Sequence, residues 1–296
     1  MTAPVEAGAH ELEAARAALA MPLGLPGSGR VRYGAAMALW RADELTLAEL
    51  EAYRICSPLD AEDPARLSVR PRPAPPADRD TAIRTAIAAI DLYLGGLPGP
   101  GIAEARHGIA AFASGPVAPP PRALRPAPSP LLDPALAALA APGPDGRPEL
   151  AAALAEVAAH LDWVTYDLYP RDGIGAAFAD GHAFAGLIDP EGPVAAPDFS
   201  LGLFLIAPHV FYRDRCHLAP ELYAPLTGPH GWRFAPGAPL VTRPAHRPIW
   251  NDPNQPHATK VGALPFLAAF AWTRDVLAPS RILPAPDWAA IEAPPS

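Results

Sequence analysis

Lysine is almost absent from this chain of 296 residues, in which Lys260 stands alone. The formal net charge is −8, and the arginines form no basic stripe interleaved with aromatic residues. Because binding to phosphate groups needs clustered lysine and arginine, we do not expect nucleic acid to be a partner.

Cysteine is also scarce, since Cys56 and Cys216 are the only two and lie far apart in the sequence. A disulfide framework is therefore not expected, and a reducing compartment fits the composition. Long apolar runs are missing as well. The most apolar run, 201–207, is closed by Pro208 and is far too short to cross a bilayer.

A signal peptide is not visible at the start of the chain. The first residues carry Glu6, Glu11 and Glu13 and lack an apolar core flanked by positive charge. We therefore expect a cytoplasmic protein that does not associate with membranes.

Helical patterns dominate the first half of the chain. Thr46 and Glu49 form a capping-box pattern, which predicts a helix that begins near Thr46. A second helix is predicted behind Asp78 and Asp80 as caps, because apolar residues recur there at helical spacing. These residues are Ile83, Ile87, Ile90 and Leu94. A third stripe follows at Leu150, Leu154, Val157 and Leu161.

Proline is abundant, with 42 residues, and it recurs every few positions from Pro116 to Pro148. Proline removes a backbone donor and fixes φ, so this stretch is predicted to be a linker. We expect a helical accessory region at 1–115, the proline-rich linker at 116–148, and a β-barrel domain with a leading helix at 149–296. This organisation belongs to the α+β class.

Short β-rich runs separated by turn residues fill the rest of the chain, and their even spacing is typical of a sandwich or small barrel. The predicted strands are Trp163–Tyr169, Ala183–Ile188, Leu201–Tyr212, Leu222–Leu226, Pro239–Thr242, Pro248–Trp250 and Leu264–Trp272.

One segment, Tyr212–Tyr223, carries most of the chemistry. If it is extended, His217, Glu221 and Tyr223 share one face of a strand. His257 lies in a turn-rich stretch after another predicted strand, and a hairpin return would bring it beside them. Two imidazoles and one carboxylate suit one divalent transition metal such as Fe, Zn, Mn, Ni or Co. The alternative is that these are polar residues at a strand end beside a core phenol.

Two stretches are similar to the motifs of cupin barrels. Gly228 follows Glu221 after six residues, which resembles the second half of the first cupin motif. The stretch from Pro253 to His257 resembles the second cupin motif, with departures from its usual sequence. Asn254 stands there in place of the usual glycine, and asparagine tolerates a positive φ.

More narrowly, a little over a third of the chain resembles the cupin dimethylsulfoniopropionate (DMSP) lyase family and its lyase-like relatives. The pieces that carry the resemblance are 161–163, 178–183, 202–208, 212–223, 250–258 and 265–272. The resemblance implies a C-terminal cupin barrel, or double-stranded β-helix, behind a mostly helical N-terminal region.

The same resemblance implies a set of site residues. By position, the metal ligands become His217, Glu221, Tyr223 and His257. Tyrosines beside the metal act as the proton-abstracting base in that family, which indicates Tyr223 first and Tyr212 second.

Three residues are candidates for contact with the substrate. Arg215 stands where the family usually has another metal-binding histidine, and arginine cannot ligate a metal. It could bind a substrate carboxylate, or it could be a solvated surface residue. His182 could line the barrel mouth, although a surface turn explains it better. Trp250 could join Trp232 and Trp272 in an aromatic box for a cation, although packing explains it equally well.

The resulting hypothesis is a metal-dependent carbon–sulfur lyase that acts on a small anionic or zwitterionic carboxylate. β-Elimination of DMSP would release dimethyl sulfide and acrylate. The alternatives are a metal cupin that oxidises or isomerises another small acid, and a non-catalytic cupin that binds a small ligand. The helical half could pack on the barrel, form part of a lid, or serve as the dimerisation element of a homodimer.

Overall fold

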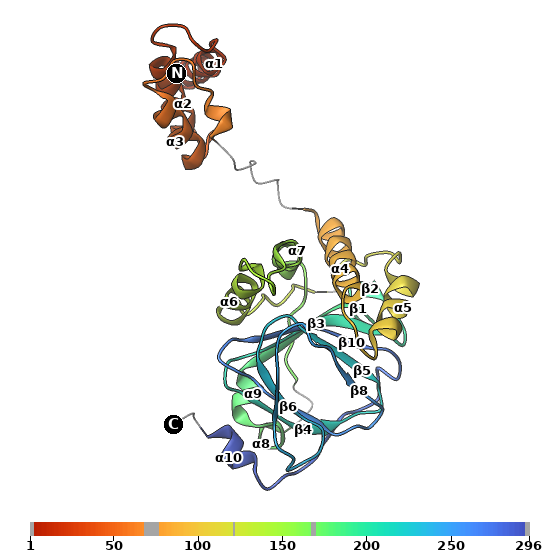
Figure 1. The fold of residues 1–296 in the computed structure, drawn as a ribbon. Helices are drawn as coiled ribbons and strands as arrows, with labels where there is room; N and C mark the ends of the chain where they lie inside the picture. Colours follow the sequence, from red (N-terminus) through yellow and green to blue (C-terminus); the bar gives the residue numbers. More distant parts are fainter. Residues whose placement is uncertain (1–2, 68–76, 121, 167–169, 294–296) are drawn as a thin grey trace. The chain divides into compact units, whose positions relative to one another are not determined.

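The computed structural model describes residues 3–67, 77–120, 122–166 and 170–293. The chain divides into two compact units, Met1–Pro76 and Ala77–Ser296 (Figure 1). This division differs from the boundaries at 115 and 148 that the composition suggested. The reason is that the helices after Ala77 pack on the barrel and share its core.

The first unit is helical. It contains α1 (Ala3–Leu19), α2 (Ser28–Arg41), α3 (Leu47–Cys56) and the 3-10 turn η1 (Pro64–Arg66). Both halves of the predicted capping box are present, since the Thr46 side chain accepts from the Glu49 amide and the Glu49 carboxylate accepts from the Thr46 amide. Ala15, Ala35 and Leu39 form a small core between α1 and α2.

The second unit begins with four longer helices: α4 (Arg79–Gly95), α5 (Ile102–Phe112), α6 (Ser129–Ala140) and α7 (Pro148–Ala158). Asp78 caps α4 by accepting from the Thr81 amide at 3.0 Å, as its position predicted. Three shorter helices are α8 (Arg171–Ile174), α9 (Ala176–Asp180) and α10 (Trp288–Glu292). In the part of the chain that is described, no helix has both the length and the apolar character needed to cross a membrane.

Two sheets of mostly antiparallel strands form a barrel of the cupin class (Figure 1). The six-stranded sheet has the order β2 (Val194–Ala195), β1 (His182–Asp189), β3 (Ser200–Ile206), β10 (Phe266–Trp272), β5 (Glu221–Pro225) and β8 (Ile249–Asn251). The five-stranded sheet has the order β11 (Arg281–Ile282), β4 (Phe211–Cys216), β9 (His257–Lys260), β6 (His230–Arg233) and β7 (Val241–Arg243). The predicted α+β class and cupin architecture are therefore confirmed.

Two apolar cores lie on opposite faces of the six-stranded sheet. The outer face packs against α4–α7, and buried residues such as Ile90, Leu154 and Leu222 belong to this first core. The inner face contributes Phe204, Tyr223 and other residues to a second core inside the barrel. Alternation along each strand sends neighbouring residues to opposite cores.

Part of the predicted linker is ordered structure. Within 116–148, α6 buries Leu132, Ala135 and Leu139 in the outer core. Pro130 is tolerated because it lies in the first turn, where the amide would have no helical partner, whereas Pro134 lies inside the helix. The segment therefore covers the sheet as well as connecting elements.

Several strand boundaries also differ from prediction. The predicted run from Leu201 to Tyr212 is two strands, β3 and β4, which lie in different sheets. The break falls at Pro208 and His209, where His209 takes a φ of 62°. Strands β2, β6, β9 and β11 were not predicted. The predicted strand 163–169 makes one isolated bridge, between Val164 and Phe184, and its last three residues lie outside the described ones.

Candidate metal centre

Two histidines and one glutamate converge in the barrel, and their ligating atoms all lie within 4.8 Å of one another. His217 directly follows β4, Glu221 opens β5, and His257 opens β9. All three are buried. Among the described His, Cys, Asp and Glu side chains, this is the only such group of three.

The route by which the chain brings them together differs from the predicted one. Tyr212–Tyr223 is not a single extended strand, because β4 ends at Cys216 and β5 begins at Glu221 in the other sheet. The chain turns through 217–220, where proline at 220 cannot supply an amide to a ladder. His217 and Glu221 therefore approach from strands of different sheets.

Asn254 holds this turn in place. Its amide donates to the His217 carbonyl at 2.7 Å, which ties the two motif loops together. Its φ of 60° is the left-handed conformation that the position of the usual glycine predicted.

The tautomers of both histidines are set by backbone carbonyls. His217 Nδ1 donates to the Ala219 carbonyl at 2.7 Å, and His257 Nδ1 donates to the Gln255 carbonyl at 2.9 Å. When such a ring is neutral, its lone pair is on Nε2. These Nε2 atoms lie 3.3 Å and 3.4 Å from Glu221 Oε2.

His257 is held in the neutral form. Burial, together with the positive charge of Arg215, lowers its pKa to about 4. Its buried Nε2 has no hydrogen-bond partner in the described part of the molecule. An unpaired buried acceptor aimed at a carboxylate oxygen is costly unless a cation lies between the two.

Glu221 is ionised and oriented by two further side chains. Burial alone would raise its pKa, but His217 and His257, when they carry a proton on Nε2, outweigh burial and hold the pKa well below its ordinary value. Trp272 Nε1 donates to Oε1 at 2.7 Å, and Asn251 Nδ2 donates to Oε2 at 3.0 Å. Both donors are cross-strand neighbours of Glu221, a relation that the sequence alone could not supply.

Three lone-pair donors of N and O type therefore face a common point, and each is oriented by a second residue. This is the donor chemistry that divalent transition metals prefer, and carbonyl-bound Nδ1 atoms are usual for metal-ligating histidines. The residues fit a metal ion. Fold and donor set together define the class: a cupin barrel with a candidate metal centre.

The two predicted tyrosines lie next to this centre, around Arg215. Arg215 Nη2 donates to the Tyr223 phenol at 3.3 Å, and its guanidinium lies 3.3 Å from the centre of the Tyr212 ring. Burial and the charge of Glu221 raise the pKa of Tyr223 well above its ordinary value, and Arg215 opposes them. Arg215 is itself only 2% exposed, which excludes the alternative of a solvated surface residue.

His182 is a buried, fully engaged residue rather than a surface turn. Nδ1 donates to the Phe178 carbonyl at 2.6 Å, and Nε2 accepts from the Tyr166 amide at 2.8 Å. Its ring stacks on Phe178 at 4.1 Å, and burial lowers its pKa. Both nitrogens are used in holding the start of β1, so neither is available for a substrate in this conformation.

Trp250 is not brought together with the candidate centre. It alternates with Ile249 and Asn251 on β8 and packs against the outer core. Gly101 lies against its ring, and a Cβ there would come within 2.0 Å of it. Trp232 lies in the inner core and Trp272 beside His217, so the three tryptophans do not form a box.

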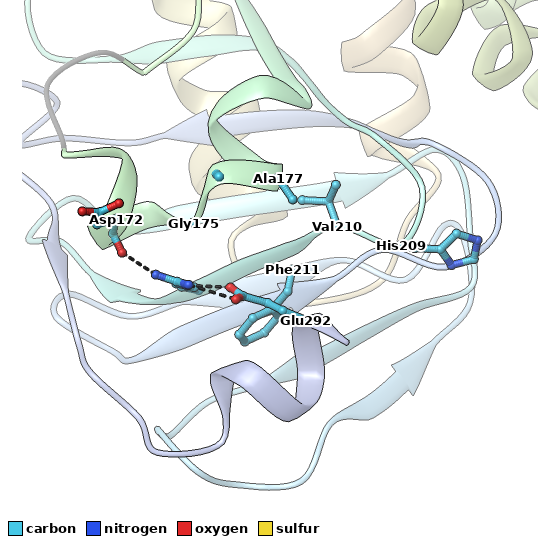
Figure 2. Close-up of a pocket in the computed structure, with 9 residues that line it drawn as sticks. Asp172, Gly175, Ala177, His209, Val210, Phe211 and Glu292 are labelled. Atoms are coloured by element: carbon cyan, nitrogen blue, oxygen red, sulfur yellow. Dashed lines mark hydrogen bonds and ion pairs between the residues drawn. The ribbon is translucent and has the colours of Figure 1, made fainter. Parts of the chain in front are cut away.

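A surface cavity of about 360 Å³ lies elsewhere, between α8–α9, β4 and α10 (Figure 2). Its lining includes His209, Phe211 and the ion pair between Arg213 and Glu292. None of its lining residues belongs to the metal centre. Because Arg213 and Glu292 in the lining already neutralise each other, we assign this cavity no role in the chemistry.

Comparison with known proteins narrows the class. A family model for DMSP lyases matches residues 106–268, which is more than half of the chain. The chain belongs to the DMSP lyase family. A curated relative from Cereibacter sphaeroides, named as the dimethylsulfoniopropionate lyase DddL, is 32% identical over 126 residues, which are 41% of this chain and 49% of that protein. The chain thus spans about half the length of this relative.

Two solved structures of proteins described as DMSP lyases share the fold. A chain from the crystal structures described as those of the DMSP lyases RdDddP and RnDddQII aligns with a TM-score of 0.51 at 21% identity. The alignment covers 69% of this chain and 98% of the solved chain. DddQ from Ruegeria pomeroyi DSS-3 aligns with a TM-score of 0.50 at 22% identity, over 69% and 96% of the two chains. At this identity the likeness concerns the fold.

Proposed function

We propose that this protein is a metal-dependent carbon–sulfur lyase that converts DMSP to dimethyl sulfide and acrylate. The observation that carries the proposal is the convergence of His217, Glu221 and His257 in the barrel of a chain from the DMSP lyase family. The substrate class is a small zwitterionic carboxylate.

His217, Glu221 and His257 would hold one divalent transition metal, with Fe, Zn, Mn, Ni and Co as candidates. When bound, the metal would supply Lewis acidity that stabilises negative charge developing at the α-carbon. Trp272 and Asn251 would keep Glu221 oriented toward it. Tyr223 remains our proposed fourth ligand, because it follows Glu221 on the inward face of β5.

The base is proposed to be a tyrosine beside Arg215. Tyr223 would accept the α-proton as phenolate, and Tyr212 is the second candidate. The electrons of the broken C–H bond form the double bond of acrylate, and those of the β-carbon–sulfur bond leave with neutral dimethyl sulfide. An ordinary phenol has a pKa of about 10, so positive charge nearby is needed to make it a base near neutral pH. Arg215 supplies part of that charge through its bond to the Tyr223 oxygen.

The test is incubation of the full-length, metal-loaded protein with DMSP, with dimethyl sulfide measured in the headspace and acrylate in solution. The proposal expects equal amounts of both products, loss of turnover on chelation and recovery when metal returns. Tyr223→Phe should lose most turnover while His217, Glu221 and His257 still hold the metal, although less tightly, and Tyr212→Phe should lose less turnover. Full turnover in both variants would contradict the assignment of the base.

A second candidate function is oxidation of another small carboxylate. Two histidines and one carboxylate are also the ligand set of iron oxygenases, and this observation favours the alternative specifically. Oxygen consumption by the iron-loaded protein, with no dimethyl sulfide from DMSP, would support it. A protein that binds neither metal nor DMSP would instead point to the non-catalytic cupin.

A further inference from the structure

Three arginines are buried or nearly buried in the five-stranded sheet, and two of them have carboxylate partners. Arg213 pairs with Glu292, with Nε 2.6 Å from Oε1. Arg233 pairs with Asp214 and Asp287. Arg215, which lies on the same strand as Arg213, takes part in no ion pair among the described residues. Of the three arginines, Arg215, which lies beside the candidate metal centre, is therefore the one without a carboxylate partner among the described residues.

The contacts of Arg215 leave its donors largely unused. A guanidinium carries five N–H donors. Only two hydrogen bonds are present among the described residues, to the Arg213 carbonyl at 3.4 Å and to the Tyr223 phenol at 3.3 Å. The Tyr212 ring below it offers a cation–π contact. A charge that is 98% removed from water with two long bonds is costly, and a carboxylate would compensate that cost.

The orientation of Arg215 places such an anion next to the candidate metal. Arg215 on β4 and His257 on β9 are register partners across the antiparallel pair. Directly opposed residues project to the same side of a sheet. Glu221 is not the partner, because it forms no ion pair with Arg215 and its two oxygens already accept from Trp272 Nε1 and Asn251 Nδ2.

We propose that Arg215 is the residue that recognises the carboxylate of the substrate. This inference rests on the proposed function for the identity of that substrate. A planar guanidinium binds a carboxylate by two parallel hydrogen bonds, whereas an amide offers one acceptor and no charge. The site therefore selects small carboxylates, even before a metal is bound.

The aromatic inner core would orient the bound ligand, with its carboxylate at Arg215 and its other end against the aromatic rings. From Tyr223, the rings of Phe204, Trp232 and Phe266 lie 6.1, 5.6 and 5.9 Å away, centre to centre. These faces suit the apolar or cationic end of a ligand whose carboxylate is held by Arg215. A zwitterion such as a sulfonium carboxylate fits both ends.

The test measures ligand binding to full-length protein that has been treated with a chelator, so that it does not depend on turnover. The ligands are propionate and propionamide, which have the same shape and differ in charge, and binding is followed by ligand-observed NMR. Wild-type protein should bind propionate at least roughly tenfold more tightly than propionamide. Arg215→Gln should remove that preference, and Arg215→Lys should keep part of it. Arg213→Gln is the matched control on the same strand and should keep the preference.

The outcomes separate this inference from the proposed function. Equal binding of the two ligands by wild-type protein, or an unchanged preference in Arg215→Gln, would overturn the role of Arg215. The wild-type comparison requires no variant to fold. If the preference follows Arg215 but DMSP is not cleaved, the carboxylate site stands and the lyase function fails. If DMSP is cleaved and Arg215→Gln has an unchanged KM for DMSP, the lyase function stands and the role of Arg215 in carboxylate recognition fails.

Discussion

The two faces of β5 differ sharply in chemistry although they alternate residue by residue. Glu221 and Tyr223 face the candidate centre and the inner core, whereas Leu222 and Ala224 belong to the outer core against the helices. The inner face holds charge and unpaired lone pairs, and the outer face is apolar throughout. Adjacent positions should therefore separate chemistry from stability, and each prediction below tests that separation.

The largest effect is expected at the inner face, from His257→Ala. This variant removes one of the three converging donors, so metal affinity should fall by more than the roughly 10–100-fold that loss of an outer partner costs. Isothermal titration with zinc measures it. The matched control is His182→Ala, which removes another buried histidine whose nitrogens bond to the backbone. Unchanged affinity in His257→Ala would show that the three donors are not a metal site.

The next effect belongs to the outer face. Leu222→Ala leaves a cavity between β5 and the helices, and should lower the free energy of unfolding by about 2–5 kcal/mol. Urea unfolding gives that value, and turnover per folded molecule should match wild type. Leu92→Ala is the control, because Leu92 is 79% exposed and its loss should be nearly neutral. A lower metal affinity in Leu222→Ala would contradict the prediction that the outer face of β5 affects stability alone.

A smaller effect is expected at Trp272. Trp272→Phe keeps an aromatic ring against His217 but removes the N–H that binds Glu221 Oε1. Metal affinity should drop by roughly 10–100-fold, as for other partners that orient a ligand. The unfolding free energy of the metal-free protein should change less than in Leu222→Ala. Wild-type affinity would mean that Glu221 needs no orientation from β10.

The smallest effect on the candidate centre is expected at His230, which lies at the inner core away from that centre and gives the stability a pH dependence. Burial lowers the pKa of His230 to about 4, against about 6.5 in the unfolded chain. The unfolded state therefore binds the proton first as pH falls. The stabilisation is complete above pH 6.5 and is lost between 6.5 and 4, by up to about 1.4 kcal/mol per pH unit.

His230→Gln should remove that one-proton slope from the urea unfolding free energy measured between pH 7 and 4.5. Metal affinity at pH 7 should stay at the wild-type value, because His230 contacts Thr227 and the Gly262 amide rather than the three donors. An unchanged pH slope in the variant would show that His230 is not the group that titrates.

Local signals in the sequence were enough to predict where helices α3 and α4 begin. Thr46 and Asp78 cap α3 and α4 as their side-chain chemistry predicts, because capping depends on neighbours within one turn. The three converging donors could also be named, although the resemblance to a family, rather than spacing, supplied their order. Their spacing had suggested one strand, whereas the chain folds them across two sheets.

The remaining features depend on long-range register, which no local pattern encodes. Trp272 and Asn251 meet Glu221 only because β10 and β8 flank β5 in a particular register. A one-residue slip would send them to the other face. The packing of Trp250 against the outer core depends on the same register, which decides the face that its side chain takes. The burial of His182 follows from stacking on Phe178 in the preceding helix.

The most direct test of the central claim is a metal titration of chelator-treated protein, with dimethyl sulfide release from DMSP measured at each step. The account predicts that release is absent without metal, rises in proportion to added metal and levels off at one ion per chain, whereas His257→Ala stays inactive throughout. Full release from the metal-free protein, or a wild-type titration curve in His257→Ala, would contradict it.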